Sequence, residues 1–440
     1  MKIAHISPGA AGMYCGTCIH NNTLARGLKK HGHDALLIPL YTPIRTDEES
    51  VAIDRVFFGA VNVYLKQGGG LWKYAPRFVQ KWLDNPALLN WVSRFSSSTN
   101  AKMLGEMTVS VLQGEHGPQR DAVEELVEWL QEDVKPDVVH VSLSLFLGLV
   151  PRIKEALGVP VVCELQGEDI FFDDLIEPYR SQALELVQQH CDHVEAFIVP
   201  CEYYRELMSQ EYGFPADRTH VVPLGIEPES FKTGDAKTGD AQANDPVTIG
   251  FLARIAPEKG LHVLTEAFKL LTDEIGTERV RLRAAGHLRE YDRAYFDKEV
   301  KRLKKWGLED SFEYVGEVDR DGKANFLAGL DIFSTPTVYR EPKGLPMLEA
   351  LASGVPVVVP SHGAYPELIQ ETGGGVLVTP ESPKDLARAL RELVEDAERR
   401  RALGLRGRQA VHAGRTSDVM AQRTADVYEV ALGISLKAVA

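Results

Sequence analysis

Short runs of apolar, often β-branched residues alternate along the chain with longer stretches whose apolar residues recur at helical spacing. Several of the short runs are apolar on both faces, as in a parallel sheet that helices cover on both sides. This alternation predicts parallel strands joined by crossover helices. The first half of the chain has predicted strands at residues 2–7, 34–41, 137–142, 159–165, 196–200 and 220–224. The second half has predicted strands at residues 247–253, 280–285, 312–318, 331–335, 355–360 and 375–379.

Residues 232–246 separate the two sets of strands and hold no large apolar side chain. Their first five residues, KTGDA, repeat immediately at 237–241. A stretch of this composition cannot dock firmly, so it predicts an interdomain linker, with a long surface loop inside one domain as the alternative. The predicted organisation is a first domain at 1–231, the linker, a second domain at 247–415 and a last segment at 416–440.

Composition and charge narrow the class of protein. The chain has 440 residues, about three times the usual size of one domain. Apolar residues make up 44% and charged residues 25%, which is typical of globular proteins. The formal net charge of -14 disfavours a dedicated nucleic-acid binder, which would need a basic surface. We therefore expect a globular protein with no nucleic-acid partner.

Three features predict a cytoplasmic protein. The count of 5 cysteines is odd, which argues against a secreted disulfide framework. The opening residues, MKIAHISPGAAG, hold an apolar stretch too short for the core of a signal peptide. The most apolar run, residues 138–150, is shorter than the roughly 20 residues that a membrane-spanning helix needs.

Arg254 and Lys259 lie between the predicted strand at 247–253 and a helical run that begins at residue 261. The free backbone amides and the dipole at the start of a helix favour anions. Two cations on such a turn predict a clamp for a diphosphate. The alternative is a pair of solvated surface charges.

Glu341 and Glu349 are separated by seven residues that include Gly344 and the start of a predicted helix. Eight positions along a helix span about 12 Å, so the two carboxylates cannot form a close acid/base pair. They suit opposite ends of one ligand. The alternative is a loop charge at Glu341 and a capping or surface residue at Glu349.

Taken in order, several segments resemble the retaining glycosyltransferases of family 4, which have two Rossmann-like domains in the arrangement called GT-B. The resemblance covers almost the whole chain and lies in LARGLKKHGHDALLIPL, PDVVHVS, VPVVCELQGEDIF, ARIAPEKG and the E-x7-E block. It implies an α/β fold whose two parallel sheets face an interdomain cleft. It also implies that a last helix, at 417–432, crosses back to the first domain.

The resemblance implies transfer of a sugar from a nucleotide-diphosphate sugar, held by the second domain, to a hydroxyl acceptor held by the first. The acceptor would be a glycan, a lipid-linked molecule or a small molecule. The anomeric configuration would be retained, by front-face attack in which a donor phosphate oxygen takes the acceptor proton. Neither a metal nor another cofactor is then required.

The same resemblance assigns roles to residues of the second domain. Arg254 and Lys259 would neutralise the donor diphosphate and stabilise the leaving group, which is electrostatic catalysis. Glu341 would lie by the donor sugar, and Glu349 would accept hydrogen bonds from the ribose. The remaining predicted donor contacts are made by backbone, at Lys343, Gly344 and Leu345 for the sugar or phosphate, and near Gly316 and Val318 for the base.

Two places depart from the family pattern. Gln166 stands where relatives commonly have a histidine that contacts the donor sugar, and glutamine can hydrogen-bond but cannot carry a proton. His140, at the end of a neighbouring predicted strand, is a candidate substitute or else a packed residue. In the first loop, Gly12 and Gly16 stand where many relatives have paired glycines, and they would keep the backbone close to the ligand.

Cys15 and Cys18 in the same loop have the spacing of a redox pair at the start of a helix. A metal site that includes His20 is a weaker alternative, because no second pair of ligands is visible. Small residues packed in the acceptor loop are the third interpretation, and the one we favour.

Residues 65–95 carry several Lys and Arg among Trp, Tyr and Phe, although the whole chain is acidic. Such a stretch suits peripheral contact with a membrane surface, or a lipid-linked or polysaccharide acceptor. Helices that pack their aromatic side chains on the first domain are the alternative.

Three other functions stay open at the level of sequence. A glucan synthase of the starch or glycogen type has a similar fold and opening sequence, but its Lys-Thr-Gly-Gly loop is absent here. A nucleotide-sugar epimerase on the same fold differs in whether the sugar leaves the nucleotide. A non-catalytic nucleotide-sugar sensor is suggested by Gln166.

Overall fold

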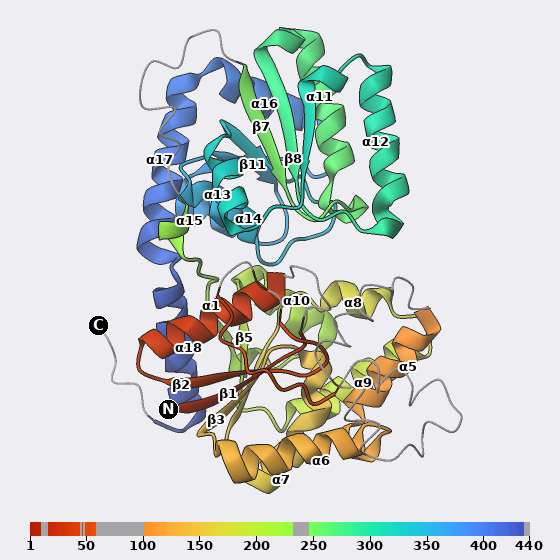
Figure 1. The fold of residues 1–440 in the computed structure, drawn as a ribbon, viewed down its shortest axis with the longest axis vertical. Coiled ribbons are helices and arrows are strands. Elements are labelled where there is room, and N and C mark those ends of the chain that lie inside the picture. The colour runs from red at the N-terminus through yellow and green to blue at the C-terminus, as the bar shows by residue number, and fades with distance from the viewer. Residues whose placement is uncertain (10–15, 45, 47–48, 59–100, 232–245, 435–440) are drawn as a thin grey trace. The chain divides into compact units, whose positions relative to one another are not determined.

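The computed structural model describes residues 1–9, 16–44, 46, 49–58, 101–231 and 246–434. Within this part of the chain there are two compact units, Met1–Pro223 with Ser417–Ala440, and Leu224–Thr416 (Figure 1). Most of the predicted linker, the basic and aromatic stretch at 65–95, Gly12 and Cys15 lie outside the described residues. No helix among the described residues is long and apolar enough to span a bilayer.

The first unit is built on a parallel sheet of six strands in the order β2-β1-β3-β4-β5-β6. The strands are β1 (Lys2–Ser7), β2 (Asp34–Pro39), β3 (Val138–Val141), β4 (Val161–Glu164), β5 (Ala196–Val199) and β6 (Thr219–Val221). Strands β3, β4 and β5 are buried at every position, as expected for strands covered on both faces.

Helices cover both faces of this sheet, and α1 and α18 lie on the face opposite α6 and α7 (Figure 1). The helices are α1 (Gly16–Lys30), α5 (Ala101–Leu112), α6 (Arg120–Trp129), α7 (Val150–Leu157), α8 (Asp169–Asp174), α9 (Tyr179–Cys191), α10 (Glu202–Tyr212) and α18 (Ser417–Ala431). Gly27 allows α18 to approach α1, because a Cβ there would lie 2.8 Å from the Cβ of Ala421. The last helix of the chain is thereby part of the first unit.

The second unit has its own parallel sheet, in the order β12-β11-β10-β7-β8-β9. Its strands are β7 (Val247–Leu252), β8 (Val280–Ala285), β9 (Phe312–Gly316), β10 (Ile332–Ser334), β11 (Val357–Pro360) and β12 (Gly375–Val378). Its helices are α11 (Leu261–Ile275), α12 (Arg293–Lys305), α13 (Arg320–Ala328), α14 (Leu345–Ala352), α15 (Tyr365–Thr372), α16 (Pro383–Glu395) and α17 (Ala397–Gly414). A buried apolar cluster joins β7 and β8 to α11 and α16, with Phe251, Phe268, Leu282 and Leu390 fully buried.

The predicted fold class is confirmed: the protein is α/β, with two parallel sheets, and all the predicted strands are present. Their ends differ by a few residues. Residues 34–41 were predicted as one strand, but the pairing of β2 with β1 ends at Pro39. An apolar run continues past the last ladder pair when the loop that follows is also buried, as Leu40 is here.

Helix α17 packs closely on the turn between α14 and β11. A Cβ at Gly404 would lie 2.1 Å from the carbonyl oxygen of Gly354, which is backbone and cannot rotate away. We therefore expect Gly404→Ala to lower the free energy of unfolding by about 1–3 kcal/mol.

Gly414→Ala is the matched control, in the same helix, because its added methyl group meets nothing nearer than Glu371 Oε1 at 3.9 Å. Its free energy of unfolding should stay within about 1 kcal/mol of the original. Urea unfolding measures both variants, and equal stabilities would contradict the close approach of α17.

Candidate functional site

The residues that the sequence singled out in the second unit lie on loops at the carboxyl ends of its strands. Arg254 follows β7, and Glu341 lies in the loop after the neighbouring strand β10. The strand order reverses between β7 and β10, because β8 and β9 continue on one side and β11 and β12 on the other. Open parallel sheets bind ligands at the carboxyl ends of strands where the order reverses. These two loops are therefore the candidate ligand site of the second unit.

The turn between β7 and α11 packs directly on the loop after β10. Gly260 has φ +80°, and a Cβ there would lie 1.8 Å from the carbonyl oxygen of Pro336, so glycine is required. The amide of Val338 donates to the carbonyl oxygen of Glu258 at 2.9 Å. This close contact holds Lys259, the last residue of the short turn Pro257–Lys259, beside the loop after β10.

Lys259 and Glu341 form an ion pair that is largely buried. Lys259 Nζ lies 2.9 Å from Glu341 Oε2 and 4.4 Å from the centre of the Tyr339 ring. The Tyr339 hydroxyl donates to the same carboxylate, and the amide of Lys343 donates to Oε1 at 3.2 Å. Burial favours the neutral acid, but Lys259 and Tyr339 outweigh it and lower the pKa of Glu341 to about 2. The carboxylate is ionised and held in place at neutral pH.

Arg254 is only partly satisfied by the residues around it. Its Nη2 pairs with Glu258 in the same turn, whereas its Nη1 is buried and has no hydrogen-bond partner among the described residues. Arg289, in the loop after β8, adds a second guanidinium nearby: burial lowers the pKa of Arg289, and the charge of Arg254 acts in the same direction. Each guanidinium also has a carboxylate partner, Glu258 for Arg254 and Asp292 for Arg289 at 2.6 Å, so their charges are partly neutralised.

Glu349 also has a cationic partner. It lies in α14, which begins after Gly344, where φ is +67°, and it is 8% exposed. Lys323 of α13 places its Nζ 2.5 Å from Glu349 Oε1. The carboxylate that would accept hydrogen bonds from a ribose is thus an ion-paired acceptor.

The other predicted donor-site residues lie on the same edge of the sheet. Gly316 ends β9 with φ +92°, and its carbonyl oxygen accepts from the amide of Gly286 at 2.8 Å. Val318 follows it and is half-buried. Leu345 is the first residue of α14. The second unit thereby brings the predicted contacts to loops at the carboxyl ends of β7, β9 and β10.

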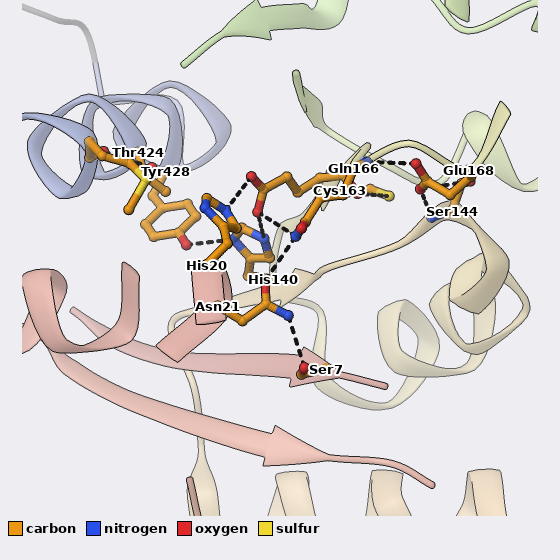
Figure 2. A network of polar contacts seen from close by, with 12 residues as sticks. Ser7, His20, Asn21, His140, Ser144, Cys163, Gln166, Glu168, Thr424 and Tyr428 are labelled. Atoms are coloured by element: carbon orange, nitrogen blue, oxygen red, sulfur yellow. Dashed lines mark hydrogen bonds and ion pairs between the residues drawn. The ribbon is translucent and has the colours of Figure 1, made fainter. Parts of the chain in front are cut away.

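In the first unit, Gln166 belongs to a buried cluster of polar side chains at the carboxyl end of β4 (Figure 2). Gln166 Nε2 donates to Asn21 Oδ1 at 2.8 Å and to Glu164 Oε2 at 3.2 Å. His20 Nε2 lies 2.7 Å from Glu164 Oε1, and Asn21 Nδ2 donates to Ser7 Oγ at 2.8 Å. Helix α1 supplies His20 and Asn21, so its first turns are bound to the end of β4.

Two further histidines line this cluster from β1 and β3. His140 is fully buried, with its Nδ1 2.6 Å from the hydroxyl of Tyr428 in α18 and its Nε2 3.3 Å from Glu164 Oε2. His5 stacks on His140 with ring centres 4.2 Å apart. Burial opposes the charge of Glu164, but His20 and His140 hold its pKa well below the usual range. His140 is a packed residue in a polar network, without contact with solvent.

The remaining predicted residues of the first unit have simple positions. Gly16 is exposed and is the first residue of α1. Cys18 is buried in the same helix, whereas Cys15 lies outside the described residues. Across the part of the chain that is described, no group of three or more His, Cys, Asp or Glu side chains could hold a metal ion.

The partners of these groups were not predicted from the sequence. Arg289 gave a usable signal, because it is a cation shortly after a predicted strand, as Arg254 is. Lys323 and Tyr428 gave none, since their partners are distant in sequence, and Glu164 gave none because His20 is 144 positions away from it. His140 and Tyr428, for example, are separated by 288 positions.

The buried His5 predicts a fall in stability at acid pH. Burial and the neighbouring His140 lower the pKa of His5 well below 6.5, so the folded protein keeps this ring neutral while the unfolded chain takes up a proton. Stability that is present above about pH 6.5 is therefore lost as the pH falls, by up to about 1.4 kcal/mol per pH unit. The free energy of unfolding of His5→Phe should fall less between pH 7 and pH 5 than that of the original protein. Urea titrations at several pH values measure this.

His116, which is exposed, provides the matched control. His116→Phe should keep the pH dependence of the original protein. The same dependence in His5→Phe as in the original would show that folding does not lower the pKa of His5.

Comparison with known proteins gives the family. Residues 236–410 match the family described as "Glycosyl transferases group 1", and residues 16–225 match the one described as "Glycosyl transferase 4-like domain". An uncharacterised glycosyltransferase of Methanocaldococcus jannaschii is 23% identical over 98% of this chain and 99% of its own. A GDP-mannose-dependent phosphatidylinositol monomannoside mannosyltransferase of Mycobacterium tuberculosis is 26% identical over 63% of this chain and 71% of its own.

Solved structures agree on the fold. Sucrose-phosphate synthase from Thermosynechococcus elongatus superimposes with a TM-score of 0.72 at 18% identity, over 98% of this chain and 99% of that one. The Anabaena protein HepE, crystallised with UDP-glucose, gives a TM-score of 0.67 at 17% identity, over 98% and 100%. The two matched domains, together with the two parallel sheets, show that this chain belongs to the family-4 glycosyltransferases with the GT-B fold.

Proposed function

We propose that this glycosyltransferase moves a sugar, with retention, from a nucleotide-diphosphate sugar to a hydroxyl acceptor. The observation that carries the proposal is the set of cation–carboxylate pairs at the carboxyl edge of the second sheet. These pairs are Lys259 with Glu341, Arg254 with Glu258, and Lys323 with Glu349. Such an edge offers cations for a diphosphate and ionised acceptors for sugar and ribose hydroxyls.

Arg254 and Lys259 are the residues that would bind the diphosphate. The buried Nη1 of Arg254 has no protein partner among the described residues, so a phosphate oxygen would satisfy it. Lys259 lies at the start of α11, whose free amides add positive potential. Both charges would stabilise the nucleoside diphosphate as it leaves, which lowers the barrier to transfer.

Glu341 and Glu349 would orient the two ends of the donor. An ionised carboxylate only accepts hydrogen bonds, so each group suits hydroxyls that donate. Glu341 would bind the transferred sugar and Glu349 the ribose. Support for a nucleotide-linked donor comes from relatives: one is named as GDP-mannose-dependent, and HepE was crystallised with UDP and with UDP-glucose.

Retention follows if the acceptor attacks the face from which the diphosphate leaves. The bond from the anomeric carbon to the phosphate oxygen breaks, a bond to the acceptor oxygen forms, and the acceptor proton passes to a donor phosphate oxygen. No protein base is needed. Lys259 and Arg254 would then take the charge-neutralising part that a metal ion plays in other transferases.

Nucleotide binding tests the donor site. Calorimetric titration with UDP, GDP and ADP should show one of them binding, and Lys259→Ala or Glu349→Ala should weaken that binding roughly tenfold or more, because each removes a charged hydrogen bond. Lys269→Ala is the matched control: Lys269 also lies in the second unit and pairs with an acid, Asp273, on the exposed side of α11. Its affinity should equal that of the original protein.

The folding of each variant must be measured together with its affinity, because Lys259→Ala leaves the buried carboxylate of Glu341 without its cation. Thermal unfolding of each variant separates loss of the site from loss of the fold. Unchanged affinity in a folded Lys259→Ala variant, or no binding of any of the three nucleotides, would refute the proposed donor site.

Measurements of turnover test whether the reaction proceeds without a metal ion and with retention of the anomeric configuration. With UDP-glucose and GDP-mannose as donors, we expect release of nucleoside diphosphate in excess EDTA at the rate seen without it. Proton NMR of the product of an α-linked donor should show an α linkage. A β linkage, or activity that EDTA abolishes and Mg²⁺ restores, would contradict this mechanism.

A further inference from the structure

We propose that Glu164 and Asn21 are positioning residues that lock the Gln166 amide, so that its carbonyl oxygen accepts a hydrogen bond from a sugar hydroxyl of the substrate. The inference rests on the proposed function and deepens it. It gives Gln166 a single hydrogen-bonding role, that of acceptor.

The contacts of Gln166 are unequal at the two ends of its amide. Nε2 has two acceptors, Asn21 Oδ1 at 2.8 Å and Glu164 Oε2 at 3.2 Å. Oε1 is buried and has no partner among the described residues. The residue is 4% exposed, so solvent does not readily satisfy that oxygen. A buried carbonyl oxygen without a donor marks a place where a ligand group would complete the hydrogen bonding.

The orientation of the amide is determined by its neighbours. If the amide were turned over, Oε1 would face the Glu164 carboxylate and the Asn21 oxygen, and both of those atoms accept hydrogen bonds. The carboxylate of Glu164 can only accept, so it fixes Nε2 as the end that faces it; Gln166 Nε2 in turn donates to Asn21 Oδ1, which leaves Asn21 Nδ2 to donate to Ser7 Oγ at 2.8 Å. Only the observed orientation avoids a contact between two acceptors at Glu164.

Glu164 is in turn held by two histidines. His20 Nε2 lies 2.7 Å from its Oε1, and His140 Nε2 lies 3.3 Å from its Oε2. Since a carboxylate accepts, His20 Nε2 carries the proton of this hydrogen bond, whereas His140 Nε2 lies near the carboxylate without a hydrogen-bond partner among the described residues. The other nitrogen of His140 lies 2.6 Å from the Tyr428 hydroxyl. Glu164 is therefore held by a hydrogen bond from His20 on α1 and by the nearby ring of His140 on β3.

The backbone of Gln166 is held as firmly as its side chain. Its amide donates to Glu168 Oε2 at 2.6 Å, and the next amide, at Gly167, donates to the Tyr204 hydroxyl at 2.9 Å. Neither the main chain nor the amide plane can turn to suit a different ligand group. A locked acceptor discriminates for a hydroxyl and against a substrate that lacks it, because the buried oxygen is then left unpaired.

The test compares variants on substrates that each lack one hydroxyl. Gln166→Met keeps the length of the side chain and removes the acceptor, while Glu164→Gln keeps the shape and lets the Gln166 amide turn over. Glu299→Gln is the matched control: Glu299 is a buried carboxylate of the second unit that accepts from Thr265 and pairs with Arg302. Asn21→Ala replaces Glu164→Gln if the latter does not fold.

Values of kcat and KM are measured for UDP-glucose and GDP-mannose with methyl glucoside and methyl mannoside as acceptors, and for the monodeoxy analogues of each. We expect the original protein to lose roughly tenfold or more in kcat/KM for one deoxy analogue. This loss is the ratio of kcat/KM for the complete substrate to kcat/KM for the deoxy analogue. Gln166→Met and Glu164→Gln should each reduce that ratio to about twofold or less, while Glu299→Gln keeps it. If the loss occurs with a deoxy donor, the hydroxyl belongs to the donor. If it occurs with a deoxy acceptor, the hydroxyl belongs to the acceptor.

Two results would overturn the inference: a folded Glu164→Gln or Asn21→Ala variant that keeps the full ratio, or an original protein that tolerates every deoxy analogue. Nucleoside diphosphate affinity, measured on the same samples, separates this failure from failure of the proposed function. If the original protein binds a nucleotide and turns over, only the role of Gln166 has failed. If it binds no nucleotide, the proposed function has failed and the inference falls with it.

Discussion

A carboxylate buried at the carboxyl edge of a parallel sheet must be surrounded by donors, and both units of this protein are organised around that constraint. An unpaired buried charge is costly, so each buried glutamate determines the side chains around it. Glu164 is surrounded by His20, His140 and Gln166, and Glu341 by Lys259 and Tyr339. The strands are parallel, so the polar groups at their carboxyl ends gather at one edge of each sheet.

The same constraint connects structure to chemistry. The partners that stabilise Glu341 include the cation proposed to bind a diphosphate, so the ion pair holds Lys259 in place before any donor arrives. Such preorganisation removes a cost of reorientation when the reaction occurs. In the first unit the partners of Glu164 have the corresponding effect on Gln166, whose amide is held in one orientation by neighbours on α1 and β4. The contacts that stabilise the buried carboxylates are therefore the same ones that orient Lys259 and Gln166 for the ligands we propose.

Much of the fold could be predicted because its determinants are local. Alternating apolar runs identified the strands, and a cation pair beside a helix start drew attention to Arg254 and Lys259. The pairing of charges could not be predicted in this way. Lys259 and Glu341 lie 82 positions apart, and only the close approach of Gly260 to Pro336 brings them together. Gln166 was visible as a departure from the family pattern, but its locked orientation depends on side chains from α1 and β4 that no local pattern links.

The proposed function depends above all on the binding of a nucleotide, through its diphosphate, at the edge of the second sheet. Calorimetric comparison of UDP with uridine, and of GDP with guanosine, tests it directly when each pair is measured at low and high salt. We expect one diphosphate to bind roughly tenfold or more tightly than its nucleoside, and the difference to shrink as salt screens the charges. Equal affinity of diphosphate and nucleoside at both salt concentrations would contradict it.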